Sequence, residues 1–296
     1  PPYIAGMQPF LKMHGLGNDF VVLDHRRQEI GLTADAVRAI ADRRRGVGCD
    51  QLVAIEPSQS ADAFLRIHNA DGGEVAACGN ATRCVAALLM AESGRSDILL
   101  ETAAGLLRCQ AADGGQVSVD MGEPRFDWRD IPLARAADTL HLDFVAQAAN
   151  GVTLADAAAV DIGNPHVVFF VTDAEAVPLA ELGPRIEHDA LFPERVNVEV
   201  AEIRAPGIIR LRVWERGAGI TQACGTGACA TLASAVRRGL GSRRAEILLD
   251  GGPLTIDWRA DNHLVMTGPV ALSFRGTLED ALLTGAPESS PEGRAA

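Results

Sequence analysis

Two cysteines have the neighbours and the spacing of reactive thiols. Cys78 and Cys224 each stand in an Ala-Cys-Gly string, 146 residues apart, and each string leads into an Ala- and Leu-rich segment without Pro, at 81–92 and 227–238. Such segments predict helices, so each thiol is expected at a helix start. There, free N–H groups and the helix dipole lower a thiol pKa from about 8.5 and can bind a carboxylate. We therefore predict that each helix start both binds a carboxylate and carries a reactive thiol.

Two equivalent thiols are compatible with a redox dithiol, a thiol hydrolase or two-base proton transfer. A hydrolase needs one cysteine with one histidine. If two helix starts share one substrate carboxylate, its α-carbon lies between the sulfurs, so a thiolate on one face can remove a proton while a thiol on the other returns one. The residues favour inversion at an α-carbon. The alternative from another class is a non-catalytic thiol switch, for which oxidation to a disulfide would be the function.

Short strings recur along the chain at the same offset of 146 residues. The matching strings are Gly17-Asn18 with Gly163-Asn164, Leu65-Arg66-Ile67 with Leu211-Arg212-Val213, Ala77-Cys78-Gly79 with Ala223-Cys224-Gly225, and Gly122 with Gly268. Several matches in register without a gap indicate a tandem duplication. Duplicated halves usually place equivalent residues around a pseudo-two-fold axis, and the two cysteines are then expected to face a shared site.

The elements that must position the cysteines have the same order in both halves. A β-branched strand (20–23; 167–171) and a second strand (64–68; 208–214) precede a Gly-rich turn, the cysteine and the helix. Gly94 and Gly239 follow the helices and suit C-terminal caps. Alternating strands come next (97–101 and 116–121; 246–250 and 263–266), whereas 124–152 shows one strand, around Phe126.

Composition excludes several classes of function. The chain of 296 residues has 27 basic and 39 acidic residues, a net charge of −12, which argues against nucleic acid as a partner. Its longest apolar runs are far shorter than the roughly 20 residues of a membrane span, and residues 1–10 do not resemble a secretion signal. A cytoplasmic protein with reduced thiols is expected, and the other cysteines are interpreted as core residues: Cys49, Cys84, Cys109 and Cys229.

Metal and pyridoxal phosphate chemistry have little support in the sequence. No CxxC or HExxH motif is present, so no metal site is expected. Pyridoxal phosphate needs a lysine for its Schiff base, and the chain has only Lys12, in a strand-like run. We therefore expect no cofactor.

Longer motifs resemble those of the diaminopimelate epimerase family. They are MHGLGNDFVVLD (13–24), GVGCDQL (46–52), RIHNADGGEVAACGNATRC (66–84), ETAAG (101–105), DIGNPHVV (161–168), ERVNVEV (194–200) and VWERGAGITQACGTGACA (213–230). The resemblance covers roughly residues 10 to 276. It implies cofactor-independent interconversion of LL- and meso-2,6-diaminoheptanedioate, in lysine and peptidoglycan precursor biosynthesis. The implied fold is α+β, with two pseudo-symmetric halves, each a curved, mostly antiparallel sheet around a central helix.

The resemblance also assigns roles to residues. Cys78 and Cys224 match the catalytic cysteines, with His166 and Glu215 as polar groups beside them. The implied substrate-binding residues are Asn18, Gln51, Asn69, Gly79, Asn80, Asn164, Asn197, Glu215, Arg216, Gly225 and Thr226. Arg216 would bind the distal carboxylate. His68 stands where the family often has an aromatic residue, and its role is left open.

The implied organisation is an N-terminal half, 9–123 plus 269–284, and a C-terminal half, 124–268, with flexible ends at 1–8 and 285–296. Strands after Gly122 and Gly268 are expected to cross to the opposite half. The partner is a small molecule, diaminopimelate, and a homodimer is possible. The alternative function is a related proline or hydroxyproline racemase, whose cyclic substrate would not need Arg216 with the Asn residues. A PhzF-like isomerase fits less well because it lacks the paired cysteines.

Overall fold

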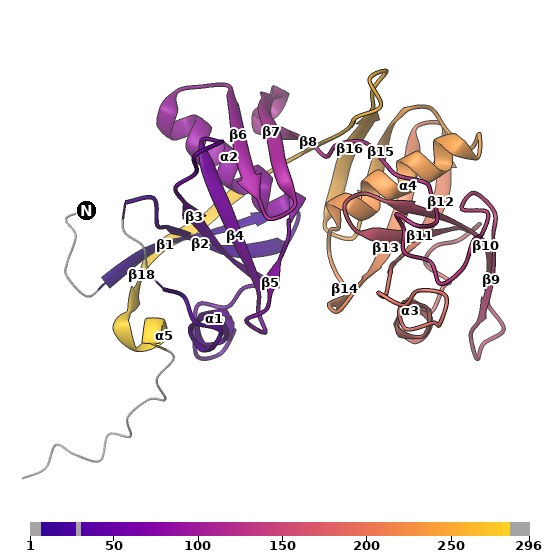
Figure 1. The fold of residues 1–296 in the computed structure, drawn as a ribbon, viewed down its shortest axis with the longest axis horizontal. Coiled ribbons are helices and arrows are strands. Elements are labelled where there is room, and N and C mark those ends of the chain that lie inside the picture. The colour runs from indigo at the N-terminus through magenta and orange to yellow at the C-terminus, as the bar shows by residue number, and fades with distance from the viewer. Residues whose placement is uncertain (1–6, 28–30, 285–296) are drawn as a thin grey trace, which may run out of the picture.

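The computed structural model describes residues 7–27 and 31–284, which form two halves that lie side by side (Figure 1). In each half a curved sheet surrounds one long helix, α2 (Gly79–Ser93) in the first half and α4 (Gly225–Arg237) in the second. The predicted α+β fold with two pseudo-symmetric halves is confirmed. Within the described ranges, the helices lack the length and apolar character that a membrane span requires.

The two halves contain the same elements in nearly the same order. The first half contains β1 (Met7–Gly15), β2 (Asn18–Asp24), α1 (Ala34–Ala41), β3 (Gln51–Glu56), β4 (Ala63–Asn69), β5 (Glu74–Val75), α2, β6 (Asp97–Thr102), β7 (Gly105–Ala112), a short 3-10 turn (Asp113–Gly115) and β8 (Gln116–Asp120). The second contains β9 (Leu142–Gln147), β10 (Thr153–Asp161), β11 (Pro165–Phe170), α3 (Leu179–Glu187), β12 (Asn197–Ala205), β13 (Ile208–Glu215), β14 (Gly219–Ile220), α4, β15 (Arg244–Leu249), β16 (Gly252–Trp258) and β17 (Leu264–Gly268). The described chain ends with β18 (Ala271–Glu279) and α5 (Asp280–Thr284).

Strand register repeats at the offset found in the sequence. Phe20 of β2 lies opposite Gln51 of the parallel strand β3, and His166 of β11 lies opposite Asn197 of the parallel strand β12. Both partners are displaced by 146 positions between the halves. The backbone therefore carries the duplication that the sequence strings predict.

Strands cross between the halves at a central junction. β8 pairs with both β7 and β17, so the two sheets are continuous there. The chain that follows β8 forms β9, which pairs with β10 of the second half. The chain that follows β17 forms β18, the yellow strand that runs along β1 of the first half (Figure 1). The first half is thus completed by β18, which follows the second half in the chain.

Side chains of successive strand residues point to opposite faces of each sheet. In the first half, Phe20 and Val53 belong to the core around α2, whereas Val21 and Leu52 belong to a smaller core against α1. In the second half, the outer face packs against α3. We call the faces that pack on α2 and α4 the inner faces.

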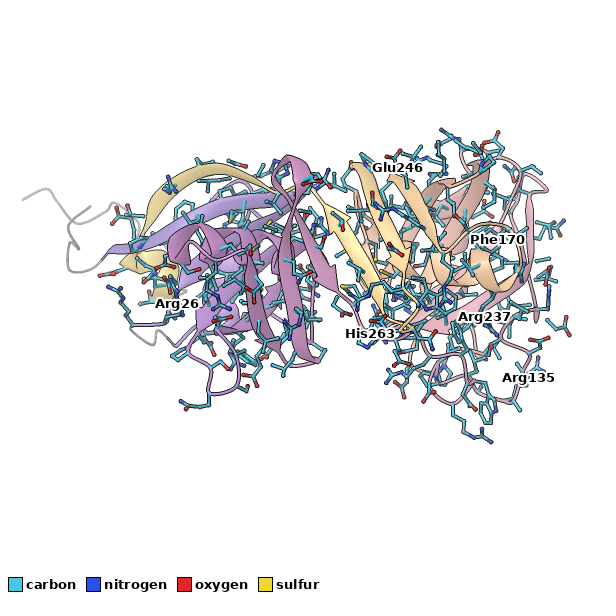
Figure 2. The ribbon with its side chains drawn as sticks, turned by 90° about the horizontal axis from the view of Figure 1, so that it is seen from above. Arg26, Arg135, Phe170, Arg237, Glu246 and His263 are labelled. Carbon is cyan, nitrogen blue, oxygen red and sulfur yellow. The ribbon has the colours of Figure 1, made fainter. Side chains whose placement is uncertain are left out.

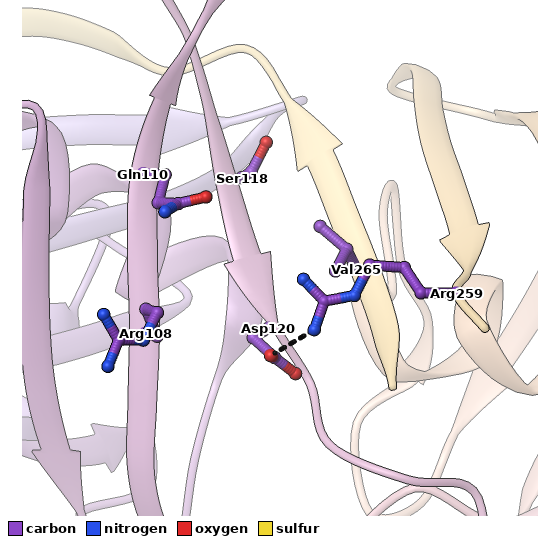
Figure 3. Close-up of a pocket in the computed structure, with 6 residues that line it drawn as sticks. All are labelled: Arg108, Gln110, Ser118, Asp120, Arg259 and Val265. Carbon is purple, nitrogen blue, oxygen red and sulfur yellow. Dashed lines mark hydrogen bonds and ion pairs between the residues drawn. The ribbon is translucent and has the colours of Figure 1, made fainter. Parts of the chain in front are cut away.

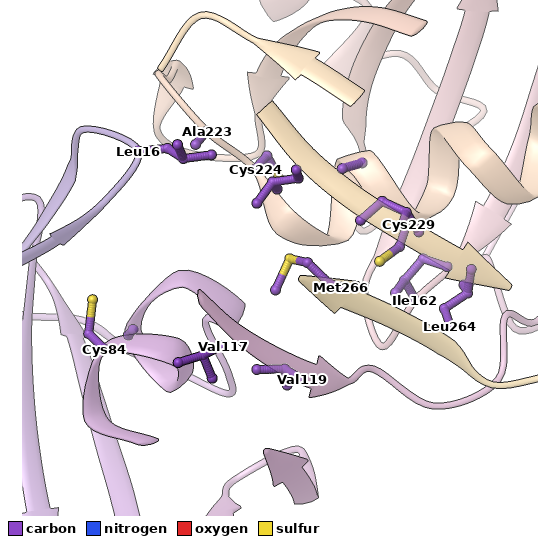
Figure 4. Packing of buried hydrophobic residues seen from close by; sticks show 14 of the residues in the cluster. Leu16, Cys84, Val117, Val119, Ile162, Ala223, Cys224, Cys229, Leu264 and Met266 are labelled. Carbon is purple, nitrogen blue, oxygen red and sulfur yellow. The ribbon is translucent and has the colours of Figure 1, made fainter. Parts of the chain in front are cut away.

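The inner core is continuous across the junction. Val117 and Val119 of β8, Met266 of β17 and Cys229 of α4 all belong to it, and all four are labelled in Figure 4. Close packing of this kind transmits displacements between its members. The starts of α2 and α4 are therefore held by one common core.

The junction is also linked by charged side chains on the outer surface. His263 lies there when the molecule is seen from above (Figure 2), and its Nδ1 is 2.8 Å from Asp120 Oδ1 of β8. Asp120 also pairs with Arg259 at 3.1 Å. These contacts join the loop before β17 to the last residue of β8.

Several expectations differ from the structure at the ends and connections. Of the ends expected to be flexible, residues 1–6 and 285–296 lie outside the described residues, while Met7 and Gln8 lie in β1. The strand expected around Phe126 is wrong, because the backbone there pairs only at an isolated bridge, Arg125 with Asp161. The strand of this region is β9.

Candidate active site

Both cysteines of interest cap their helices at the N-terminus. Cys78 is the N-cap of α2 and Cys224 the N-cap of α4, and both have extended backbone angles. The first helical residues after each are glycines, Gly79 and Gly225. The predicted position of each thiol at a helix start is confirmed.

A side-chain amide joins the two helix starts. Asn80 Nδ2 donates to the carbonyl oxygen of Ala223 at 2.9 Å, across the interface of the halves, and to Asn18 Oδ1 at 3.1 Å. Asn80 is 2% exposed, and these two bonds satisfy the buried Nδ2 group, whereas Oδ1 has no hydrogen-bond partner among the described residues. The second residue after Cys78 thus binds the residue before Cys224.

The two glycines allow both helix starts to approach the same methionine. A Cβ atom at Gly79 would lie 2.7 Å from Met266 Cε, and one at Gly225 would lie 2.6 Å from Met266 Sδ. Real Cβ atoms do not approach so closely, so neither position accepts a side chain without movement. Cys78 and Cys224 are therefore fixed on two helix ends that converge at the junction.

The Cys78 thiol is partly buried beside a polar side chain. Its Sγ lies 3.9 Å from Asn18 Oδ1, and Asn18 is oriented by Asp50, whose Oδ2 accepts from Asn18 Nδ2 at 3.0 Å. Burial raises the pKa of Cys78 to about 11, and the N–H groups of Ala81 and Asn80 oppose the rise. The prediction of a lowered thiol pKa is wrong here, because desolvation outweighs the helix start.

Cys224 is buried more deeply and faces negative groups. The N–H of Gly227 donates to its Sγ at 3.4 Å, and Thr226 Oγ1 lies 3.5 Å away. Burial, followed by the charges of Glu215 and Glu199, raises the pKa of the thiol well above its usual range. The lowered pKa predicted for Cys224 is therefore also wrong.

Glu215 and His166 both lie on the inner face beside Cys224. Thr221 Oγ1 donates to Glu215 Oε1. Burial raises the pKa of Glu215, while its bonds with Thr221 and Cys224 oppose the rise. His166 Nε2 lies 2.8 Å from Asn164 Oδ1, so the ring connects the Asn164 turn to the interior. The structure thus brings Glu215 against Cys224 and His166 near Glu215.

The remaining predicted amides are held by bonds within the protein. Gln51 Nε2 donates to Asn69 Oδ1 at 2.9 Å in the first half. Asn197 Nδ2 donates to Pro165 O at 2.9 Å, and its Oδ1 accepts the N–H of Arg216 at 2.9 Å. Asn197 is thus bound to backbone at both ends of its amide, so in this structure it fixes the loop that carries Arg216.

Arg216 is exposed, and its side chain is only lightly held. Its Nη1 donates to Glu194 O at 3.0 Å. An arginine presents five donors, so most of its hydrogen-bonding capacity is available to a ligand. The guanidinium lies on the residue after Glu215, whereas Asn69 and Ala70 occupy the equivalent positions in the first half.

Strand alternation explains why the predicted residues share one face. In the second half, His166, Val168, Val213 and Glu215 alternate with outward residues along β11 and β13, and the two valines belong to the inner core. By the same alternation His68 lies on the outer face of the first sheet, opposite Leu52 of β3. His68 is buried there, away from the face that carries Cys78.

Two site residues were not predicted. Glu199 on β12 accepts from His166 Nδ1 at 2.7 Å, and neither side chain is exposed to solvent. Arg83 on α2 is fully buried, and its Nη1 lies 3.2 Å from Met266 Sδ. The offset carried a signal for Glu199, since its equivalent in the first half is the apolar residue Val53.

A separate cavity lies on the outer surface of the junction (Figure 3). Its volume is about 280 Å³, and it is lined by Arg108, Gln110, Ser118, Asp120, Arg259 and Val265. Ser118 and Asp120 alternate along β8 with Val117 and Val119, which face the inner core. The cavity is therefore on the face opposite the cysteine-bearing helices.

Comparisons with known proteins agree with this geometry. A sequence model of the diaminopimelate epimerase family matches residues 10–127 and 158–273. The diaminopimelate epimerase of Rhodospirillum centenum is 59% identical over 285 residues, covering 95% of this chain and 96% of that protein. The diaminopimelate epimerase of Acidiphilium cryptum is 55% identical over 280 residues, covering 95% and 99%.

A solved structure shows how widely the architecture is shared. A hydroxyproline epimerase from Agrobacterium vitis, with bound trans-4-hydroxy-L-proline, has a TM-score of 0.66 and covers 95% of each chain. Its sequence identity is 20%, so the likeness extends to the fold alone.

Proposed function

This chain belongs to the diaminopimelate epimerase family and is an isomerase, and from this we propose that it interconverts LL- and meso-2,6-diaminoheptanedioate by proton transfer between Cys78 and Cys224. The reaction would serve lysine and peptidoglycan precursor biosynthesis. The observation that carries the mechanism is the bond between Asn80 and Ala223, which holds the two cysteine-bearing helix starts together.

The substrate carboxylate is bound by the free N–H groups at the starts of α2 and α4. Two helix dipoles then favour the negative charge that develops at the carboxylate when the α-carbon loses its proton. Gly79, Asn80, Gly225 and Thr226 supply these N–H groups, because they are the first residues of the two helices. The reacting carbon is thereby placed between the two sulfurs.

The chemistry at the α-carbon requires one thiolate and one thiol. A thiolate removes the proton and becomes a thiol, while the opposite thiol donates its proton to the other face and becomes a thiolate. Burial raises the pKa of both thiols, which makes each thiolate a stronger base once it forms. A strong base suits the very weakly acidic α-proton of an amino acid.

The other end of the substrate carries an amine and a carboxylate. We assign these to Glu215 and Arg216, with the amides of Asn69, Asn164 and Asn197 around them, because complementary charges and several polar groups fix a zwitterion. A cyclic imino acid has no such distal end. The asymmetry between Glu215-Arg216 and Asn69-Ala70 therefore supports diaminopimelate as substrate.

The protein's own acid and base groups are sufficient for this scheme. The single lysine, Lys12, is buried and pairs with Asp19 at 2.6 Å, so its ammonium already has a partner. Reduced thiols are required at both positions, which fits a reducing compartment such as the cytoplasm.

We also infer a homodimer, supported by the exposed apolar residues Leu272 and Phe274 on β18. Sedimentation equilibrium would test this inference.

The assignment is tested by incubating the reduced protein with LL-diaminopimelate in D2O. The expected result is formation of the meso isomer, with deuterium incorporated at the inverted α-carbon. Proline and trans-4-hydroxyproline serve as matched substrates for the alternative racemase. Turnover of an imino acid without exchange on any diaminopimelate isomer would overturn the assignment.

A further inference from the structure

A buried ion pair in the second half has no equivalent in the first. His166 Nδ1 and Glu199 Oε1 are 2.7 Å apart, with both side chains fully buried. At the offset of 146, the equivalent residues of the first half are Phe20 and Val53, which are also fully buried but apolar. The same backbone register thus accepts either an apolar or a polar pair.

The fold therefore does not require the polar pair for stability. Moving a charged pair out of water is costly, and apolar residues of similar volume are often at least as stable. Buried titratable groups with a specific partner are common where chemistry occurs. The presence of His166 and Glu199 in one half only indicates a role that only this half performs.

Glu199 lies next to the thiol of Cys224. A Cβ atom on Gly227 would be 2.9 Å from Glu199 Oε1 and 3.3 Å from Cys224 Sγ. The carboxylate and the thiol therefore both lie next to Gly227, on the side where a side chain would be. The equivalent residue in the first half is Ala81, which lies near an apolar neighbour, Val53, in the same core. Gly227 and Glu199 thus occur together in the second half, and Ala81 and Val53 replace them in the first.

Hydrogen bonds hold the pair on both sides of the ring. Glu199 Oε1 lies 2.7 Å from His166 Nδ1. The other ring nitrogen lies 2.8 Å from Asn164 Oδ1. Burial raises the pKa of Glu199, and His166 opposes the rise.

The charges that face the two thiols differ. Cys224 is approached by Glu199 from β12 and Glu215 from β13, and His166 of β11 acts on both carboxylates. Cys78 is affected by Glu215 and, in the opposite sense, by the guanidinium of Arg83 on its own helix. A thiolate at Cys224 would therefore face two carboxylates, whereas a thiolate at Cys78 would face one carboxylate and one cation.

We propose that Glu199 is a positioning residue that orients His166 and, by its charge beside Gly227, holds Cys224 as the protonated member of the thiol pair. This inference rests on the proposed two-base reaction. In the resting protein Cys78 is the first of the two to become a thiolate, and Cys224 carries the proton that is delivered to the opposite face. After turnover the proton taken by Cys78 exchanges with water, and Cys224 takes one back.

The test measures the protonation of each cysteine directly. The full chain is labelled with 13Cβ-cysteine, and the thiol pKa values are read from NMR titrations, with signals assigned by Cys78→Ala and Cys224→Ala. In Glu199→Gln the pKa of Cys224 is expected to fall by about one unit or more and that of Cys78 to stay near its original value. In activity assays kcat should fall about tenfold or more, because Cys224 is then less fully protonated when the substrate binds.

Two further variants keep the result interpretable. Glu202→Gln removes a carboxylate of the same strand that accepts the N–H of Ala174 on the outer face, and it should change neither thiol pKa. The double variant His166→Phe with Glu199→Val installs the apolar pair of the first half. It should fold at least as stably as the original chain, and it should lower the pKa of Cys224 even if Glu199→Gln fails to fold.

An unchanged Cys224 pKa in both the single and the double variant would overturn the inference, as would an equal shift at both thiols. These titrations do not depend on the substrate. If the chain failed to act on diaminopimelate, the proposed function would fall while the pKa of Cys224 still reported on Glu199. If the chain is active and Glu199→Gln retains both kcat and the Cys224 pKa, only the role of Glu199 fails.

Discussion

Asn80 of α2 and Ala223, which precedes α4, are joined by a side-chain to backbone hydrogen bond of 2.9 Å between residues 143 positions apart in the chain. This bond connects the two cysteine-bearing helix starts directly. It makes the geometry of the candidate site dependent on the contact between the halves.

Replacement of Asn80 by Ala should weaken both the site and the fold. The change leaves the carbonyl of Ala223 without this donor, so the free energy of unfolding is expected to fall by about 1–3 kcal/mol and kcat/KM to fall with it. Urea unfolding and steady-state kinetics measure the two effects. Thr226→Ala, at the equivalent position, is the stability control, because its hydroxyl only contacts Cys224 Sγ. Equal destabilisation by both changes would contradict the bridging role.

The two cysteines should be individually essential. Cys78→Ala and Cys224→Ala are each expected to reduce epimerisation by about 100-fold to 10,000-fold, the range for loss of a general acid or base. Chiral chromatography of the products provides the measurement. Cys109→Ala is the control, since Cys109 is buried on β7 and should affect stability only. Full activity in either site variant would rule out the two-base mechanism.

Activity should increase with pH on the alkaline side of neutrality. The pKa of Cys78 is raised to about 11 and that of Cys224 is higher than usual as well, so few thiolates exist near pH 7. As the pH rises toward the pKa of Cys78, its thiolate fraction grows by up to about tenfold per pH unit, while Cys224 remains protonated. A pH profile of kcat/KM between about pH 7 and about pH 9 checks this, and a flat or falling profile would disagree.

Asp19 should stabilise the fold at neutral pH but not in acid. Burial alone would raise its pKa, but hydrogen bonds from Arg43, Lys12 and the N–H of Asp50 lower it well below the usual range. A group with a depressed folded-state pKa stabilises the fold above its unfolded pKa of about 3.9 and loses that contribution as the pH falls through the folded value.

The corresponding variant is Asp19→Asn. At pH 7 it should be less stable than the original chain by about 2 kcal/mol, and the difference should shrink as the pH is lowered below about 4. Chemical unfolding at both pH values measures it. Asp35→Asn, which removes an exposed pair with Arg38, should have little effect at either pH. A difference that grows in acid would contradict the assigned direction.

Arg83 should destabilise the fold while lowering the pKa of Cys78. Its guanidinium is fully buried, Nε and Nη2 have no hydrogen-bond partner in the described part of the chain, and burial lowers its pKa. Arg83→Met should therefore raise the Tm, because an incompletely paired buried charge is removed. It should also raise the pKa of Cys78, because a nearby cation is lost. A lower Tm with an unchanged Cys78 pKa would show that Arg83 acts only by packing.

The sequence predicted the parts of the site that depend on local structure. Helix starts at Cys78 and Cys224 follow from Ala-rich segments bounded by glycines. Gly94 caps α2 with the left-handed backbone that glycine adopts readily. The cap predicted at Gly239 is one residue off, because Arg238 is the C-cap of α4 and Gly239 follows it in the left-handed conformation. The offset of 146 also carried the strand register. These features depend on short stretches of chain, so a single sequence records them.

Features that depend on three-dimensional packing were not predicted. The direction of the thiol pKa changes followed from burial, which composition cannot measure. Among the elements that were not predicted are the helices α1 and α3 and the strand β9, which are short or have apolar faces defined only by the sheet they cover. Glu199 was visible as a charged residue at an apolar position of the repeat, but only the structure shows that it contacts His166.

The strand exchange at the junction makes each half depend on the other for its own completion. A cut between residues 123 and 124 would leave the first fragment without β18, whose removal exposes the edge of β1, and would leave β8 without its partner β17. Unpaired edges of this kind favour aggregation over independent folding. The two halves therefore form a single cooperative folding unit. The chain should unfold in one transition although its sequence is a tandem duplication.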